Sequence, residues 1–248
     1  MKALGRLLVL ALLAGLALQL YFACRIALMA VVNPESTAFE RSEVYQLAKN
    51  TGIKWRQQWV PYAQVSDHLK RAIIASEDAS FVIHDGVDME ALEKAWEKNA
   101  RVQERAAQSL SRLAESKTSM PAVRAPKIVG GSTITQQLAK NLFLSGERTL
   151  LRKGQELLLT LMLESLLSKQ RILEIYLNSA EWGEGVFGAE AAAQHYYRKP
   201  ASRLSAYEAA RLAVMLPRPK YFETRANSGY LASRARTITA RMSGVELP

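Results

Sequence analysis

Titratable side chains gather in the stretch SEDASFVIHDGVD, which contains Glu77, Asp78, His84 and Asp88. Glu77 and Asp78 follow an apolar helical pattern, so at least one carboxylate is expected to face a cleft. A carboxylate at an apolar rim has a raised pKa, which suits a general base near neutral pH. Three interpretations remain open: plain surface acids at a helix end, a metal site made by Glu77, His84 and Asp88, and acid/base chemistry on a sugar. In the last of these, His84 and Asp88 shape the turn. The spacing of Glu77, His84 and Asp88 matches no zinc-ligand pattern.

A second segment, GGSTITQQLAKNLF from Gly130 to Phe143, is polar but carries no charge before Lys140. Its neutral donors and acceptors suit a sugar or phosphate ligand. The alternative is a polar helix start with one of its hydroxyl residues as N-cap. The candidate ligand contacts are Ser132, Thr133, Gln136, Gln137 and Lys140, and the two N-cap candidates are Ser132 and Thr133.

A third group recurs at every fourth position of a predicted helix: Arg152, Glu156, Thr160 and Glu164. Nearly all other residues from 157 to 167 are apolar, so we expect this helix to be buried with its polar stripe facing partners or a cavity. An Arg152–Glu156 ion pair within the helix is one reading. The functional reading places Arg152 and Lys153 on phosphate oxygens, with Glu156 in the same cleft.

Asn178 precedes a segment in which Gly183, Gly185 and Gly188 allow a tight loop before the next helix. The segment lacks the Gly-Lys-Ser/Thr ending of a P-loop, so nucleotide binding is not supported. These glycines are interpreted as a structural turn. The sequence leaves the roles of Glu181 and Glu184 open.

The elements that must position these residues are predominantly helical. Residues 33–50 are expected to form a polar linker and 52–62 a loop or short strand, and no internal repeat or βαβ alternation is found. A helix begins near Ser66 and its pattern breaks around 81–86. A Ser205-x-x-Glu208 capping box starts a later helix that Pro217 and Pro219 stop. Further helices are predicted at about 89–114, 133–144, 149–168, 169–178, 188–197, 205–215 and 229–242.

Composition favours an anionic partner. The chain has 248 residues and a formal charge of +10, which points to nucleic acid, lipid head groups or a phosphorylated substrate. The sole cysteine, Cys24, makes an internal disulfide impossible and a cysteine zinc site improbable. A basic excess over segment 97–128 is interpreted first as a solvated surface and second as a contact with anionic lipid.

The N-terminus predicts a membrane anchor. From Leu7 to Cys24 the only plainly polar side chain is Gln19, and the apolar character resumes after Arg25. The stretch is long enough to cross a bilayer, and Lys2 and Arg6 favour a cytoplasmic tip. A cleaved signal peptide is the alternative. We expect a tip and anchor over 1–32, a linker over 33–60 and a domain over 61–248 outside the membrane, which makes nucleic acid an unsuitable partner.

Five stretches occur together in one order that resembles the peptidoglycan glycosyltransferase family, in particular its monofunctional, membrane-anchored members. They are SEDASFVIHDGVD, GGSTITQQLAKNLF, RKGQELLLTLMLE, KQRILEIYLNSAEWGEGVFGAEAAAQHYYRKPASRLS and EAARLAVMLPRPKYF, and they span most of residues 70–222. The resemblance implies a mainly α, lysozyme-like domain that polymerises lipid II at the bacterial inner membrane. The domain would lie in the periplasm behind its single transmembrane helix.

The resemblance also implies residue roles. Glu77 would be the general base that deprotonates the acceptor 4-hydroxyl, and Glu156 the second essential carboxylate. Undecaprenyl pyrophosphate would leave with inversion, its charge met by Lys140, Arg152 and Lys153. The family often uses Mg²⁺ or Mn²⁺. The residues expected to line the substrate cleft are Asp78, His84, Ser132, Thr133, Gln136, Gln137 and Asn178.

Two features depart from typical members. The chain ends soon after the last motif, so separate transpeptidases are expected to cross-link the growing glycan strand, with division or elongation proteins as further partners. The segment between the first two motifs looks long and is expected to contact membrane lipids. A lysozyme-like hydrolase and a membrane-anchored scaffold protein remain the rival functions.

Overall fold

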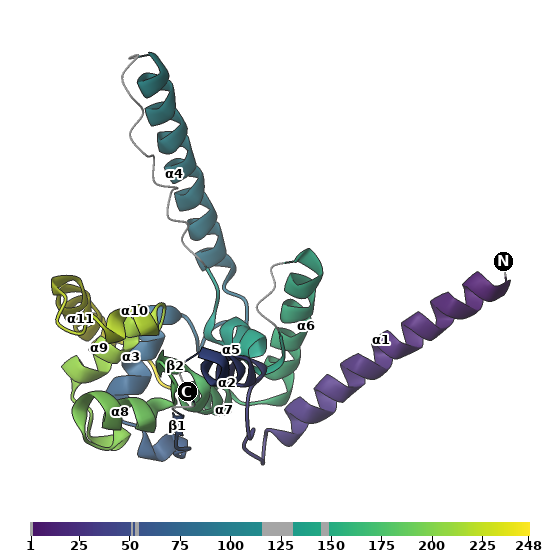
Figure 1. Cartoon of the computed structure of the whole chain (residues 1–248), viewed down its shortest axis with the longest axis horizontal. Helices are drawn as coiled ribbons and strands as arrows, with labels where there is room; N and C mark the ends of the chain where they lie inside the picture. Colours follow the sequence, from purple (N-terminus) through teal and green to yellow (C-terminus); the bar gives the residue numbers. More distant parts are fainter. Residues whose placement is uncertain (1, 51, 53–54, 116–130, 145–148) are drawn as a thin grey trace.

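A computed structural model describes residues 2–50, 52, 55–115, 131–144 and 149–248 (Figure 1). Two long helices extend from a helical body: the N-terminal α1 (Lys2–Leu28) and α4 (Met89–Glu115). The body contains α2 (Ala38–Asn50), α3 (Asp67–Glu77), α5 (Ile134–Phe143), α6 (Leu150–Leu166), α7 (Lys169–Ser179), α8 (Ala189–Tyr197), α9 (Ala206–Met215), α10 (Pro219–Glu223) and α11 (Gly229–Arg241). Single 3₁₀ turns occupy Tyr62–Gln64, Ala201–Arg203 and Met242–Gly244. The expectation of a mainly α fold is confirmed.

The predicted helices form close to their expected bounds because their caps are local. Ser66 accepts a hydrogen bond from the His68 backbone N–H at the start of α3, and Ser205 and Glu208 form the predicted capping box of α9. Between the hydroxyl candidates for α5, Thr133 is the N-cap, in a reciprocal capping box with Gln136.

The linker expected over residues 33–50 is wrong, because helix α2 occupies most of it. The Thr37 hydroxyl accepts the Glu40 N–H, and the Glu40 carboxylate accepts the Thr37 N–H at 2.6 Å. These two bonds form a Thr-x-x-Glu capping box, whose residue types and spacing are evident in the sequence. Both side chains are buried, so α2 is a packed part of the body.

The structure also contains a small sheet, which the sequence analysis does not predict. Strands β1 (Arg56–Gln57), β3 (Val186–Phe187) and β2 (Glu181–Gly183) lie in that order, with β1 parallel and β2 antiparallel to β3. The interpretation of the glycines as a structural turn is confirmed. Gly188 has φ 82°, and a Cβ there would lie 2.7 Å from the Asn178 carbonyl oxygen, so only glycine fits.

The prediction that α6 is buried around its apolar circumference is wrong. Leu159 and Leu163 are fully buried, but Leu157, Leu158 and Leu161 are each more than 40% exposed. The exposed leucines continue at the helix start, where Leu150 and Leu151 are about 90% exposed. An apolar helix face need not pack against protein where lipid can cover it. Figure 1 shows α6 beside the base of α1, on the side from which the anchor leaves the body.

Helix α4 projects away from the body (Figure 1). The basic segment predicted over 97–128 falls partly outside the described residues, since 116–130 are not among them. Within α4 itself acidic and basic residues balance: Glu90, Glu93, Glu97, Glu104 and Glu115 against Lys94, Lys98, Arg101, Arg105 and Arg112. Any lipid contact by α4 would therefore not rest on its net charge.

Candidate active site

Glu77 is the last residue of α3 and lines a cavity of about 530 Å³. Its Oε2 accepts a hydrogen bond from the Gln137 side-chain amide at 3.0 Å. Burial raises the pKa of Glu77 above its usual value, and the neighbouring Asp78 charge adds to the shift, against the lowering effect of Gln137. The raised pKa expected for a general base is therefore present.

Tyr176 of α7 is a site residue that sequence reasoning missed. Its hydroxyl donates to Gln137 Oε1 at 3.0 Å, which leaves the Gln137 NH₂ group to donate to Glu77. Burial raises the pKa of Tyr176 well above 10, so the phenol keeps its proton. The orientation of the Gln137 amide is thus fixed by a group two helices away. No residue type or spacing in the sequence distinguishes Tyr176, because it lies on the buried side of an amphipathic helix.

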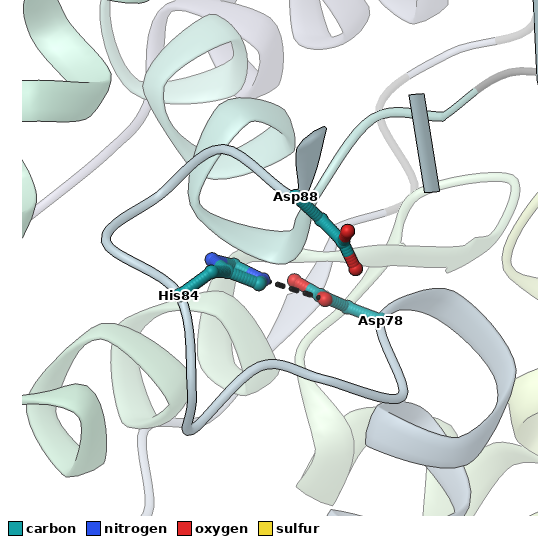
Figure 2. A group of neighbouring side chains, drawn as sticks. All are labelled: Asp78, His84 and Asp88. Atoms are coloured by element: carbon teal, nitrogen blue, oxygen red, sulfur yellow. Dashed lines mark hydrogen bonds and ion pairs between the residues drawn. The ribbon is translucent and has the colours of Figure 1, made fainter. Parts of the chain in front are cut away.

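Asp78 and His84 tie the end of α3 to the start of α5 (Figure 2). Asp78 Oδ2 accepts the Ile134 backbone N–H at 2.9 Å, and Oδ1 lies 2.8 Å from His84 Nε2. His84 Nδ1 accepts from the Gly86 N–H, so Nε2 carries the proton and donates to Asp78. The structure therefore gives Asp78 and His84 a positioning role next to Glu77, although Asp78 also lines the Glu77 cavity.

Asp88 directly precedes α4 and shapes the turn, as expected. Its Oδ1 accepts the Ala91 N–H at 2.7 Å and its Oδ2 accepts the Ser80 hydroxyl. These hydrogen bonds lower the pKa of Asp88. Figure 2 shows the Asp88 side chain directed toward the Asp78–His84 pair.

A second cavity, of about 360 Å³, lies between α5 and α6. Three cationic residues line it, together with polar residues of α5 and the apolar Phe39 and Leu144. The predicted members are Ser132, Gln136, Gln137, Lys140, Arg152, Lys153 and Glu156. Ser132 lines both this cavity and the Glu77 cavity, so the two spaces adjoin at the start of α5.

Glu156 is buried between the two cations of its own helix. It accepts from Arg152 Nη1 at 3.1 Å and pairs with the Lys153 ammonium. The Arg152–Glu156 ion pair and the cavity-lining role thus coexist. Arg152 Nε is buried without a hydrogen-bond acceptor among the described residues. Both cations stand in the first turn of α6, where the helix dipole disfavours positive charge. An anion in the cavity would be attracted by both cations and favoured by the helix dipole.

Asn178 does not join the other site residues. It is fully buried, and its Oδ1 accepts the Val60 N–H while its Nδ2 donates to the Val60 and Glu174 carbonyls. The placement of Asn178 on the cleft wall is therefore wrong. Its side chain fastens the segment before α3 to α7.

Replacing Asn178 by Ala should lower the free energy of unfolding by about 2–4 kcal/mol, because the buried N–H and carbonyl of Val60 lose their partner and the Glu174 carbonyl loses one hydrogen bond. The expected readout is a lower melting temperature in detergent, with kcat/KM per folded molecule unchanged. Asn178→Asp should not restore stability, since a carboxylate cannot donate to the two carbonyls. A raised KM at normal stability would contradict this assignment.

Glu181 of β2 belongs to a second charged cluster, on the α10 side of the sheet. Its side chain is only 9% exposed and its Oε1 lies 3.4 Å from Lys220 Nζ, which also pairs with Glu43. Burial raises the pKa of Glu181 to about 7, with Lys220 opposing and Glu43 adding to the shift.

Because the folded protein favours the protonated form of Glu181, its contribution to stability is full below pH 4.5 and is lost as pH rises to about 7. Glu181→Gln should therefore remove part of the stability loss between pH 5 and 8. We expect a gain of about 1–3 kcal/mol at pH 8 and little change at pH 5. Thermal unfolding across this range is the measurement, and parallel profiles for variant and wild type would contradict it.

The arrangement can support group transfer between an acceptor hydroxyl and a phosphorylated donor. A carboxylate of raised pKa faces one space, a cation-lined pocket forms the next, and hydroxyl and amide side chains of α5 line the boundary. A base on one side of a reacting carbon and anion-binding groups on the other suit a single displacement with inversion.

Comparison with known proteins agrees with this chemistry. A family model described as Transglycosylase matches residues 44–243. A protein of Burkholderia thailandensis named biosynthetic peptidoglycan transglycosylase is 52% identical over 236 residues, covering 95% of this chain and 84% of its own length. The protein of the same name from Burkholderia multivorans is 52% identical, with 95% and 87% covered.

Proposed function

Because this chain belongs to the transglycosylase family and is a peptidoglycan glycosyltransferase, we propose that its substrate is lipid II. The enzyme would join lipid II into β-1,4-linked glycan strands and release undecaprenyl pyrophosphate. The observation that carries this proposal is the adjoining pair of cavities, one with the Glu77 carboxylate and one with Lys140, Arg152 and Lys153. A glycan hydrolase, which releases no pyrophosphate, has no use for the second.

In the proposed reaction Glu77 removes the proton from the 4-hydroxyl of the acceptor GlcNAc. The hydroxyl oxygen attacks the anomeric carbon of the donor MurNAc from the face opposite the leaving group. The bond from that carbon to the pyrophosphate oxygen breaks, and its electron pair leaves with undecaprenyl pyrophosphate. Gln137 holds Glu77 Oε2 throughout, which fixes the direction from which the proton is taken.

The leaving group would lie between α5 and α6. Arg152 offers a planar fork of N–H donors, and Lys140 and Lys153 offer compact charges. Negative charge that grows on the pyrophosphate as the bond breaks is stabilised by these groups, and binding at the α6 N-terminus adds the helix dipole. Glu156 keeps Arg152 and Lys153 in place before the anion arrives.

The family resemblance raises the question of where Mg²⁺ or Mn²⁺ would bind. The described residues contain one group of ligand type, Asp78, His84 and Asp88, whose ligand atoms lie within 4.8 Å of one another. This group does not fit a resident cation, because neither ring nitrogen of His84 is open: Nδ1 accepts the Gly86 N–H, and Nε2 holds the proton that it donates to Asp78.

We propose that Mg²⁺ or Mn²⁺ enters bound to the substrate pyrophosphate, since Mg²⁺ keeps its waters and prefers phosphate oxygens to a protein cage. Calorimetric titration of the protein with Mn²⁺ alone should then show no saturable site. Saturable binding that Asp88→Asn abolishes would overturn this assignment.

The chain has one candidate membrane span among its described residues, the exposed and apolar α1. We propose that it crosses the inner membrane with Lys2 and Arg6 on the cytoplasmic side, so that the catalytic domain lies in the periplasm. The exposed leucines of α6 would then enter the outer leaflet beside the anchor, which brings the pyrophosphate pocket to the lipid surface.

Replacing Leu157, Leu158 and Leu161 together by Ser should weaken retention of the full chain in liposomes after high-salt washing and lower polymerisation there. Activity in detergent micelles should fall much less, since the detergent imposes no fixed depth. The matched control is a triple Ser variant of α11 at exposed positions Tyr230, Arg234 and Ala240, far from α6 in Figure 1. Equal loss in liposomes and micelles would contradict the lipid contact.

Incubation of the purified full chain with lipid II tests the proposed function directly. We expect a ladder of glycan polymers on gels and release of undecaprenyl pyrophosphate in equal amount to the bonds formed. Shortening of preformed glycan without pyrophosphate release would favour the hydrolase. No product across varied detergents and cations would favour the scaffold.

A further inference from the structure

The last turns of α1 are packed into the catalytic body. From residue 2 to residue 18 every position described is exposed, whereas Gln19, Phe22 and Arg25 are partly covered. Ile26 and Met29 are buried members of the main hydrophobic core. The membrane anchor therefore continues into the fold, where a flexible tether would show no such burial.

A reciprocal amide pair joins the anchor to α6. Gln19 Nε2 donates to Gln155 Oε1 at 2.9 Å, and Gln155 Nε2 donates to Gln19 Oε1 at 3.0 Å. Gln19 is the only plainly polar side chain between Leu7 and Cys24. In apolar surroundings the two amides have few other partners, so the pair selects one rotation of α1 against α6.

Other contacts join the same part of α1 to α5 and α7. The Phe22 and Phe143 rings meet edge to face with centroids 5.3 Å apart, and the Arg25 guanidinium lies 5.6 Å from the Phe143 centroid. Arg171 of α7 donates to the Met29 carbonyl at 2.7 Å and to the Val32 carbonyl at 3.1 Å. Met29 and Val32 lie in the turn directly after α1, so these bonds fasten the end of the anchor to α7.

The contacted helices are the two walls of the cation-lined cavity. Gln155 directly precedes Glu156, and Phe143 lies about one turn after Lys140 on α5. We propose that α1 is a brace that fixes α5 and α6 relative to each other, with Gln19 and Gln155 as positioning residues for the pyrophosphate pocket. This inference rests on the proposed function for its effect on catalysis, but the docking itself does not.

The length of α1 agrees with this placement. With Lys2 and Arg6 at the cytoplasmic side, the segment from Leu7 to Arg25 rises about 27 Å, close to the hydrocarbon thickness of about 30 Å. Gln19 and Phe22 then lie in the outer half of the hydrocarbon. The amide pair would sit where water competes little, and Arg25 would reach the head groups.

A mutant cycle in liposomes tests the brace. Gln19→Leu and Gln155→Leu should each lower kcat about three- to tenfold, the size expected for an interhelical hydrogen-bonded pair, with KM nearly unchanged. The double variant should recover most of kcat, because neither amide is left without a partner. Leu12→Ala, on the free part of the anchor, is the matched control. Wild-type kcat in both single variants, or a double variant as slow as the product of the singles, would overturn the proposal.

Cross-linking tests the docking without reference to activity. In a Cys24→Ser background, Gln19→Cys with Gln155→Cys should cross-link within one chain with a short bifunctional thiol reagent in membranes. Leu12→Cys with Gln155→Cys should not. Equal cross-linking of both pairs, or none of either, would overturn the brace. If the wild type makes no polymer but the pair cross-links, the proposed function fails and the docking stands.

Discussion

Replacing Glu77 by Gln should lower the rate of lipid II polymerisation by about a thousandfold, the middle to upper range for loss of a general base. The amide cannot accept the acceptor proton, yet it has nearly the shape of the acid, and its oxygen can still accept from Gln137. The measurement is single-turnover polymer formation with saturating lipid II. Asp85→Asn, at an exposed acid of the following loop, is the matched control and should keep the wild-type rate.

The same variant should be more stable than the wild type at neutral pH. Burial raises the pKa of Glu77, so the ionised form costs stability once pH exceeds the usual value of 4.5. The neutral amide avoids that cost. For the wild type, kcat/KM should rise with pH through the raised pKa, because the base must be ionised. A stable Glu77→Gln variant that polymerises at the wild-type rate would remove Glu77 from the mechanism.

Replacing Glu156 by Gln should lower kcat/KM about a hundredfold or more, comparable to losing a preorganised charge-stabilising group. Arg152 and Lys153, in the first turn of α6, would both lose the carboxylate with which they pair. Breaking a buried ion pair costs about 3–5 kcal/mol, and the half-exposed Lys153 brings the expected loss of stability to about 2–3 kcal/mol.

Glu164→Gln separates the two effects of the Glu156 change. Glu164 lies two turns further along α6, is comparably buried and pairs with Lys169 at 2.9 Å, but lines neither catalytic cavity. It should lose similar stability while keeping its kcat per folded molecule. If both variants lose activity only in proportion to unfolding, Glu156 is structural and the pocket assignment fails.

The sequence predicts the parts of this fold whose signals are local. Helix α9 begins at its capping box, and α3 ends at Glu77 where the apolar pattern stops. Helix α2 was not predicted because its composition is polar, although Thr37 and Glu40 have the spacing of a capping box at its start. Helix α2 packs against α5, which comes much later in the chain, and polarity alone does not reveal that.

The site was predictable in chemistry but not in geometry. Glu77, Lys140, Arg152 and Glu156 carry signals in their type and spacing. Asn178 carries a similar polar signal, yet its partners are backbone groups of a distant segment. The exposed leucines of α6 were misjudged because apolar periodicity does not distinguish a protein core from lipid. The role of Tyr176 could not be predicted, because its sequence pattern is that of an ordinary aromatic residue in a protein core.

The chain of hydrogen bonds from Tyr176 through Gln137 to Glu77 has one more consequence. Gln137 can only donate to Glu77, and a carboxylic acid still has an oxygen that accepts such a bond. When Glu77 takes a proton from the acceptor, the Gln137 amide therefore need not rotate, and it keeps its hydrogen bonds to Glu77 and Tyr176. Once the pyrophosphate has left and the next substrate has bound, Glu77 needs only to have released its proton to solvent, and the hydrogen bonds that orient it are already in place for the next addition.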